Sequence, residues 1–276
     1  LLALLYCIRN RSETIDVLKG LVIAGIVTIL VVGAGYNLTF NPMLYLDGLS
    51  RIYTTGAPGY QYYLLGEASE TPWWYYHLAA FGLKTPASIL LLLGLSIGGL
   101  FLRHSNRETT WFLAIPAILM LLVSCFDQTN LGFRRILPAV PFLLLMTAGI
   151  PSVLLTISTR WIHLGLVLIT VTSSTVTFPH YLSYINQIVG GPDRGPHLLD
   201  DSNLDWGQDL PSLAQWQQQH PELDELKLMY FGNVRPEHYG VCSLPIPEQD
   251  ILQPRPGHYA ISAHNLVWLR KIKQRT

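Results

Sequence analysis

Charged side chains are scarce in this sequence. Only 13% of its 276 residues are Asp, Glu, Lys or Arg, whereas 50% are hydrophobic and the mean hydropathy is +0.30. This composition is too apolar for an ordinary globular domain of that length. Long apolar runs fill the first two thirds of the chain, and polar residues crowd the region after Phe178. We therefore expect a boundary near Phe178–Pro179, with a transmembrane helical domain at 1–178 and a polar domain at 179–276.

The sequence also lacks a basic block and any regular spacing of cysteines. Its net charge is zero, so nothing indicates a nucleic-acid partner held through its phosphates. The three cysteines, Cys7, Cys125 and Cys242, lie far apart without metal-ligand spacing, and no disulfide framework is implied. No two histidines have a helical metal-ligand spacing such as i, i+4. We assign no metal ligand.

What the sequence has instead is long apolar runs. A membrane helix needs about 20 mainly apolar residues, and five runs approach that length: 18–36, 86–102, 111–125, 136–157 and 161–178. The fold class that we predict is a membrane all-α bundle of about five transmembrane helices, followed by a small α/β extracytoplasmic domain. A buried core helix of a soluble protein is the alternative for the second or third run.

The charges around these runs predict the orientation. Lys and Arg concentrate in three loops, at Arg9, Arg11, Lys19, Arg103, Arg107 and Arg160. By the positive-inside rule these loops are cytoplasmic, which places the polar domain on the extracytoplasmic side of the membrane. The chain begins with a short apolar run and no Met, so we expect it to be the C-terminal portion of a longer protein, incomplete at its N-terminus.

Two strands and two helices are predicted in the polar domain. Residues 226–231 alternate as a strand does, and residues 257–262 are a second strand. Asp209 resembles a helix N-cap before an apolar stripe, and a final helix is expected at 265–273. A small α/β domain follows from these elements.

The loop between the first two apolar runs is rich in aromatic residues. Aromatic rings with a polar edge favour the headgroup layer, so one interpretation is an interfacial membrane segment. The other is that the rings line a groove for a lipid or a sugar, with Lys84 available for a phosphate. The residues of this predicted substrate groove are Glu67, Trp73, Trp74, Tyr75, Tyr76 and His77.

Two adjacent arginines, Arg134 and Arg135, lie at the outer edge of the fourth run, against the orientation bias. An arginine at membrane depth must find a partner, and its planar fork matches phosphate or carboxylate oxygens. We predict that both face an anion-binding cavity with Lys84, and we assign these three residues to lipid-phosphate binding. The alternative is that the arginines snorkel to ordinary headgroups.

Residues 200–209 contain four acids, an Asn and a Gln. Such acidity is typical of loops that bind a divalent cation, but the spacing lacks the Gly and the terminal Glu of an EF-hand. We favour a hydrogen-bonded turn that docks onto the membrane-side loops. The residues of this outer-domain motif are Asp201, Asn203, Asp205, Trp206, Gln208 and Asp209.

Four segments carry a resemblance to a known family. They are Tyr63–Glu67, Trp73–Tyr76 with Lys84–Pro86, Leu131–Pro138 leading to Phe142, and Asp201–Leu210. Together they resemble the integral-membrane glycosyltransferases that use a polyprenyl-phosphate sugar donor, similar to bacterial protein-mannosyltransferase-like and aminoarabinose-transferase-like enzymes. The match covers most of the chain.

The resemblance implies a many-helix fold with its active-site loops outside, a lipid-phosphate donor, and inverting sugar transfer that a divalent metal assists in some members. In that family the catalytic acid lies in the first outer loop, a part absent from this sequence, so we assign no catalytic residue. Arg135 also departs from the family, where His or Tyr is more usual at its position.

The predicted function is that of the C-terminal portion of such an enzyme, which moves a sugar from a polyprenyl phosphate to an extracytoplasmic acceptor. Arg and Lys side chains would stabilise charge on the departing phosphate. The alternative is a non-enzymatic accessory or scaffold subunit of a larger respiratory or photosynthetic membrane complex. The expected partners are the lipid bilayer, the polyprenyl-phosphate sugar and, under the alternative, other membrane subunits. A divalent cation is the one cofactor considered.

Overall fold

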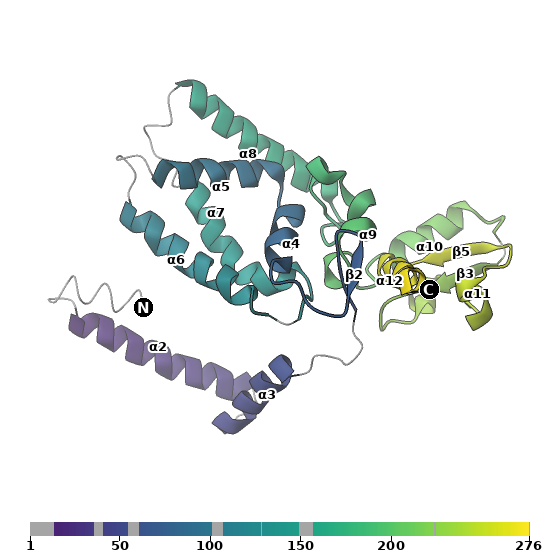
Figure 1. Ribbon diagram of the computed structural model, residues 1–276, viewed down its shortest axis with the longest axis horizontal. Helices are drawn as coiled ribbons and strands as arrows, with labels where there is room; N and C mark the ends of the chain where they lie inside the picture. Colours follow the sequence, from purple (N-terminus) through teal and green to yellow (C-terminus); the bar gives the residue numbers. More distant parts are fainter. Residues whose placement is uncertain are drawn as a thin grey trace. The chain divides into compact units, whose positions relative to one another are not determined.

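The computed structural model describes residues 14–35, 41–54, 61–100, 107–127, 129–148, 157–223 and 225–275 (Figure 1). Its contacts divide the chain into two compact units, Leu1–Pro58 and Gly59–Thr276. Each unit is described by itself. The predicted boundary at Phe178–Pro179 stays a prediction, and Arg9, Arg11 and Arg103, on which the predicted orientation partly rests, lie outside the described residues.

The first unit holds α2 (Thr14–Gly35) and α3 (Pro42–Thr54). Helix α2 has 22 residues with a hydropathy of 2.4, and only 6% of its most apolar stretch is buried. At ~1.5 Å per residue it is about 33 Å long, which matches the ~30 Å of a bilayer core. Its length and apolarity are therefore those of a membrane span or of a signal sequence.

The helices of the second unit form a layered cluster in its first part. They are α4 (Tyr76–Lys84), α5 (Ala87–Leu100), α6 (Arg107–Ser124), the 3-10 helix η2 (Phe133–Ala139), α7 (Val140–Ala148) and α8 (Ile157–Thr177). Leu93, Ala114 and Met146 form the small buried core where α5, α6 and α7 meet. Helix α8 joins α5 through a 2.7 Å hydrogen bond between the hydroxyls of Ser88 and Thr170.

The prediction of about five transmembrane helices is wrong. Among the described residues, α2 is the one helix that is by itself long and apolar enough to cross a membrane. Helices α4 and α5 reach that length only as a pair, and the pair is bent by 114°. Helix α5 alone has 14 residues, about 21 Å of α-helix, which is too short for the hydrocarbon core.

The later expected spans fail for two further reasons. In the run at 136–157, Pro138 and Pro141 lack the N–H groups that an α-helix needs, and the described part is a 3-10 helix followed by an α-helix of nine residues. In the last run, α8 has 21 residues, but hydroxyl side chains such as Thr170 and Ser173 dilute its apolar character.

A hairpin and an irregular segment cover α4. Strands β1 (Tyr62–Leu64) and β2 (Glu67–Ser69) pair antiparallel. Leu64, Tyr76 and Leu83 pack in one buried cluster with Ile185 and Leu204. The segment after α8 contains the short elements η4 (Gln187–Val189), η5 (Pro192–Arg194), α9 (Gly195–Leu198) and η6 (Asp201–Asn203). This cluster attaches residues 179–276, which we call the polar segment, to the helices.

The last part of the chain is a small parallel sheet with helices (Figure 1). Its strand order is β4 (Leu244–Pro245), β3 (Leu226–Met229), β5 (His258–Ile261). The helical elements are α10 (Leu210–Gln219), η7 (Pro236–Tyr239), α11 (Glu248–Leu252) and α12 (Ala263–Arg275). Strands β3 and β5 and helix α12 lie where the sequence predicts strands and a final helix. Asp209 occupies the N-cap position of α10, but its side chain makes no capping bond.

Candidate functional site

A groove of about 440 Å³ lies where α4, η2 and α8 meet the polar segment. We call it the cationic groove, because Lys84 and Arg134 line it together. Its other lining residues are Pro86, Phe133, Leu137, Ser173, Ser174, Thr177, Tyr181, Leu182, Tyr184 and Ser202. The groove therefore combines two cations with hydroxyl groups and apolar side chains.

Lys84 is held at the end of α4 by backbone oxygens. Its Nζ donates hydrogen bonds to the carbonyl oxygens of Leu182, at 2.6 Å, and Asn203. Both acceptors are uncharged, so they fix the ammonium group without neutralising it. Burial lowers the pKa of Lys84 to about 8, so the ammonium form still predominates at neutral pH, and an anion in the groove would favour it further.

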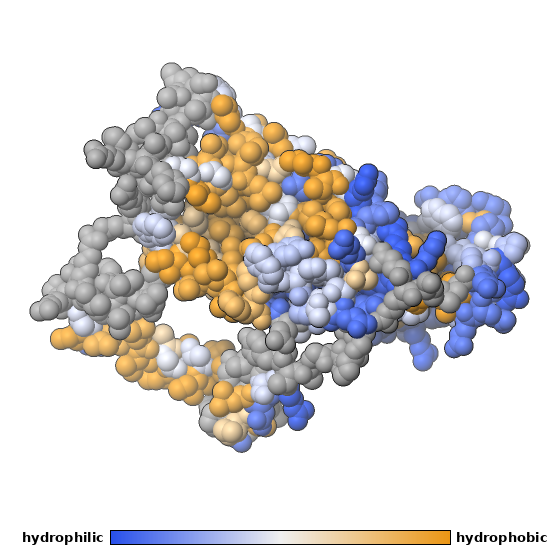
Figure 2. All heavy atoms as spheres, in the orientation of Figure 1, coloured by the Kyte–Doolittle hydropathy of each residue, from blue (hydrophilic) through white to orange (hydrophobic). Residues whose placement is uncertain are grey.

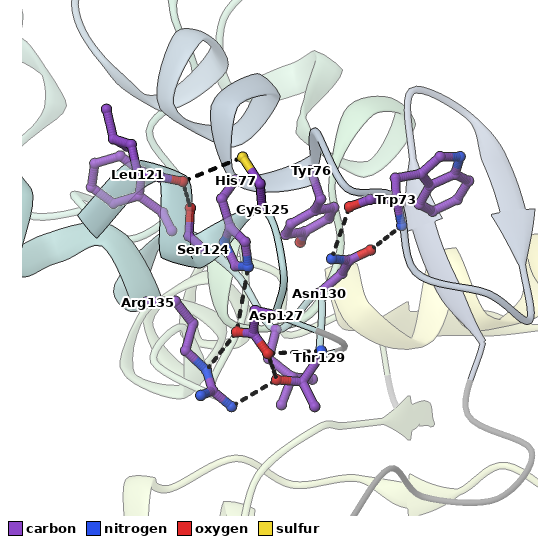
Figure 3. Close-up of polar contacts among 12 residues, drawn as sticks. Trp73, Tyr76, His77, Leu121, Ser124, Cys125, Asp127, Thr129, Asn130 and Arg135 are labelled. Carbon is purple, nitrogen blue, oxygen red and sulfur yellow. Dashed lines mark hydrogen bonds and ion pairs between the residues drawn. The ribbon is translucent and has the colours of Figure 1, made fainter. Parts of the chain in front are cut away.

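The two adjacent arginines point to different surroundings. They lie on η2, and successive residues of a 3-10 helix are about a third of a turn apart. The Arg134 side chain is exposed at the cationic groove, with its guanidinium 5.3 Å from the centre of the Trp206 ring. Arg135 instead lies 3.7 Å from the carboxylate of Asp127 and donates a 2.9 Å hydrogen bond to the hydroxyl of Thr129 (Figure 3).

Asp127 also faces the fully buried His77 (Figure 3). The Nε2 atom of His77 is 3.5 Å from the carboxylate, too long for a good hydrogen bond, and Nδ1 has no hydrogen-bond partner among the described residues. Burial works to raise the pKa of Asp127, but the contacts with His77 and Thr129 and the charge of Arg135 outweigh it and lower the pKa to about 2. Asp127 is therefore ionised, and its negative charge balances the positive charge of Arg135.

Asn203 joins the outer-domain motif to the helices. Its amide nitrogen donates a 2.9 Å hydrogen bond to the hydroxyl of Tyr76, and its amide oxygen accepts one of 2.9 Å from the backbone N–H of Phe133. The neighbouring Ser202 hydroxyl donates to the carbonyl of Leu131 at 2.7 Å. The motif thus docks onto the loop before η2.

Gly132 makes this docking possible. Its φ is +98°, a conformation that side-chain-bearing residues rarely adopt. A Cβ atom at this position would lie 2.3 Å from the Ser202 hydroxyl oxygen. The glycine in the motif before the two arginines is therefore required by both its backbone conformation and its close contact.

A buried ion network lies at the start of the same motif. The Asp200 carboxylate accepts hydrogen bonds from Lys271 Nζ at 2.5 Å and contacts His264 Nδ1 at 2.9 Å. Burial opposes ionisation of Asp200, but the contacts with His264 and Lys271 lower its pKa. The pKa of the adjacent Asp201 is raised by burial and by the charge of Asp200. The network anchors α12 to the motif.

The rest of the motif is a set of local turns. The Asp205 carboxylate accepts hydrogen bonds from the backbone N–H groups of Gly207 and His264, and the Gln208 side chain accepts one from the N–H of Trp206. Asp209 is exposed and lies 3.4 Å from His180. Among the described residues, no group of three or more His, Cys, Asp or Glu side chains is arranged to hold a metal ion.

The structure disperses the predicted substrate groove. Tyr76 and His77 are buried inside the helical cluster, and Trp74 is 67% exposed on its outside. Trp73 exchanges two hydrogen bonds with Asn130, and Glu67 lies at the start of β2. Of Glu67, Trp73, Trp74, Tyr75, Tyr76 and His77, none lines the cationic groove in the part of the chain that the structure describes.

Asp127 was missing from the sequence-based site. The signal that points to it is an acid shortly before two arginines in an otherwise apolar region.

No family model, no curated protein and no solved structure matches this chain.

Proposed function

We propose that this chain is the lipid-phosphate-binding portion of a membrane glycosyltransferase, and that the cationic groove binds the phosphate of a polyprenyl-phosphate sugar. The observation that carries the proposal is the meeting of Lys84 and Arg134, from distant parts of the sequence, in one groove. Arginine binds phosphate through two parallel hydrogen bonds, and lysine binds it as a point charge.

The remaining lining suits an amphiphilic donor. Ser173, Ser174 and Thr177 provide hydroxyl donors for phosphate oxygens, and Phe133 and Leu137 provide apolar contact for the first part of a prenyl chain. In the reaction, Arg134 and Lys84 would stabilise the negative charge that develops on the departing phosphate. We assign no general base to the groove, because its lining contains no carboxylate.

The surface of the helices supports contact with lipid. Figure 2 shows apolar surface over α5–α8 and hydrophilic surface toward the C-terminal elements. Trp111, Phe112, Ile162 and Leu168 are each at least half exposed there. Such a large apolar surface indicates a membrane or a partner. We propose a bacterial inner membrane as its location, with the polar segment on the extracytoplasmic side.

Donor binding tests the proposal. A labelled polyprenyl-phosphate mannose is titrated into the full chain in lipid nanodiscs. Arg134→Ala is expected to weaken binding by about 1.5–3 kcal/mol, the scale of a hydrogen bond to a charged group, or about 10- to 150-fold. Arg134→Lys should restore binding only in part, because an ammonium lacks the bidentate fork.

The control is Arg235→Ala, which removes an exposed arginine that does not line the groove and should leave donor binding unchanged. Equal binding by the wild type and Arg134→Ala would refute the site. If no donor binds and the chain instead purifies in fixed ratio with other membrane proteins, the accessory-subunit hypothesis is favoured.

A further inference from the structure

A second cavity, of about 210 Å³, lies at one edge of the parallel sheet. We call it the sheet-edge pocket. It is lined by Asp205, Gly207, Asp209, Leu210, Leu213, Leu228, Tyr230, Ala260, Ile261, Ser262 and Ala263. None of these residues lines the cationic groove, so the two cavities are separate.

The pocket lies where open α/β sheets bind ligands. Strands β3 and β5 are parallel, and the residues that follow both of them line the pocket. Helices α10 and α12 begin at the same edge (Figure 1). The chain passes from the central strand β3 to β4 on one side of it, and from β4 it crosses to β5 on the other side of β3. Ligands of such sheets bind outside the carboxyl ends of the strands at this switch point.

The lining of the pocket divides into an apolar floor and a polar rim. Leu210, Leu213 and Leu228 form the floor, while Asp209 and Tyr230 belong to the rim. There is no Lys, Arg or His in the lining, which disfavours an anion. A sugar ring presents apolar C–H faces together with hydroxyl groups, and an exposed carboxylate accepts hydrogen bonds from hydroxyls.

One polar group in the lining has no hydrogen-bond partner among the residues that the structure describes. The Ser262 hydroxyl oxygen is buried and makes no hydrogen bond. A buried polar atom without a partner costs about 1–3 kcal/mol, so a group that satisfies it is expected in the functional state. The Ser262 hydroxyl lies below the surface of the sheet-edge pocket, so its side chain must rotate toward the cavity before a ligand hydroxyl can bond to it.

Two glycines leave room for the tyrosine of the rim. A Cβ atom at Gly207 would lie 2.3 Å from the Tyr230 hydroxyl oxygen, and one at Gly232 would lie 2.1 Å from it. The Tyr230 side chain therefore lies close to the backbone at both glycines. A fixed aromatic ring with a polar tip is suited to contact with a sugar.

We infer that the sheet-edge pocket binds one uncharged sugar residue. The ligand class follows from the lining; identifying that sugar as part of the acceptor rests on the proposed function. The pocket is smaller than the ~300–1,000 Å³ of sites for drug-sized ligands, which matches a single ring.

Direct binding of monosaccharides tests this inference without any transfer reaction. Mannose, glucose and N-acetylglucosamine are each titrated into the full chain, and saturation-transfer NMR detects the bound sugar. At least one should bind saturably, whereas inorganic phosphate should not compete with it. Leu213→Trp fills the pocket and should reduce sugar affinity at least tenfold. Gln215→Trp, at an exposed position of the same helix outside the lining, should not.

Two further variants keep the outcome unambiguous. If Leu213→Trp fails to fold, Asp209→Asn, on the exposed rim, replaces it and should weaken binding severalfold. Arg134→Ala should leave monosaccharide binding unchanged, so a failure of the donor site and a failure of this pocket are distinguishable. The inference is overturned if no sugar binds saturably, or if the pocket variant and its control behave alike.

Discussion

The helices α5–α8 and the polar segment after α8 depart from ordinary burial in opposite directions. On the helices, large apolar side chains such as Phe112 and Val123 are exposed, by 56% and 63%. In the polar segment, the ionisable groups of Asp200, Asp205 and Lys271 are buried. Single exposed apolar residues are normal, but a large contiguous apolar surface is not, and buried charges are rare unless they are paired.

The comparison indicates two different sources of stability. The helices bury little apolar surface among themselves, so they depend on a covering medium or partner. The polar segment depends on a few specific polar contacts, each of which matters because an unpaired buried charge is costly. Single charge substitutions should therefore damage the polar segment far more than the helices.

The largest effect is expected from Asp200→Asn. The substitution leaves Lys271 buried without its counter-ion, and breaking a buried ion pair costs about 3–5 kcal/mol. Chemical denaturation of the full chain measures the loss. Hydrogen exchange should quicken in α12 and in residues 200–209, but not in α5–α8.

A matched control for that variant is Asp193→Asn, which removes an exposed carboxylate and should change stability by less than about 0.5 kcal/mol. Adding Lys271→Met to Asp200→Asn should recover part of the loss, since the buried lysine charge is then removed as well. If Asp200→Asn destabilised the helices as much as the polar segment, the two regions would not be independent in the way proposed.

A smaller effect is expected from Gly132→Ala, at the contact between the two regions. Alanine disfavours φ of +98°, which costs about 1–3 kcal/mol, and its Cβ displaces the Ser202 hydroxyl from Leu131. Denaturation should show the loss, and residues 200–209 should exchange faster. In contrast, a Cβ atom added at Gly165, in helix α8, would meet no atom within 4 Å beyond the backbone of its own helix. Gly165→Ala should therefore be neutral or stabilising by up to about 1 kcal/mol. Equal effects of the two variants would contradict this account of the junction.

The sequence predicts the local elements better than the arrangement of the helices. The alternating pattern at Leu226–Met229 and the run at His258–Ile261 do form strands, because a period of two is a local property. The number of membrane spans was wrong, because apolar composition does not reveal where prolines end a helix or where the chain bends by 114°.

The site shows the same limit at the level of single residues. Lys84 and Arg134 lie in one groove, as Lys84 and the arginine pair were expected to do. Whether they bind a lipid phosphate stays a prediction. Arg135 was expected beside them, but a 3-10 helix directs it to Asp127. The sequence does not show that turn geometry, so two adjacent arginines could not be told apart.

The smallest effect is expected from raising the pH, and it should act on the polar segment through His264. Burial opposes the charged form of His264, but contact with Asp200 and the charge of Asp201 outweigh it and raise its pKa, despite the opposing charge of Lys271. A group with a raised pKa in the folded state stabilises the fold fully below its ordinary pKa of about 6.5. That contribution is lost as the pH rises through the folded-state pKa. Because the ion pair between Lys271 and Asp200 remains, the loss is smaller than in Asp200→Asn. Denaturation midpoints measured from pH 6 to pH 9 should therefore fall gradually in the wild type.

The His264→Gln variant should be less stable at pH 6 and should show a flatter pH profile. Hydrogen exchange, corrected for its intrinsic pH dependence, should quicken at α12 and not at α5–α8. An identical slope in wild type and His264→Gln would assign the pH dependence to another group and would remove His264 from the network.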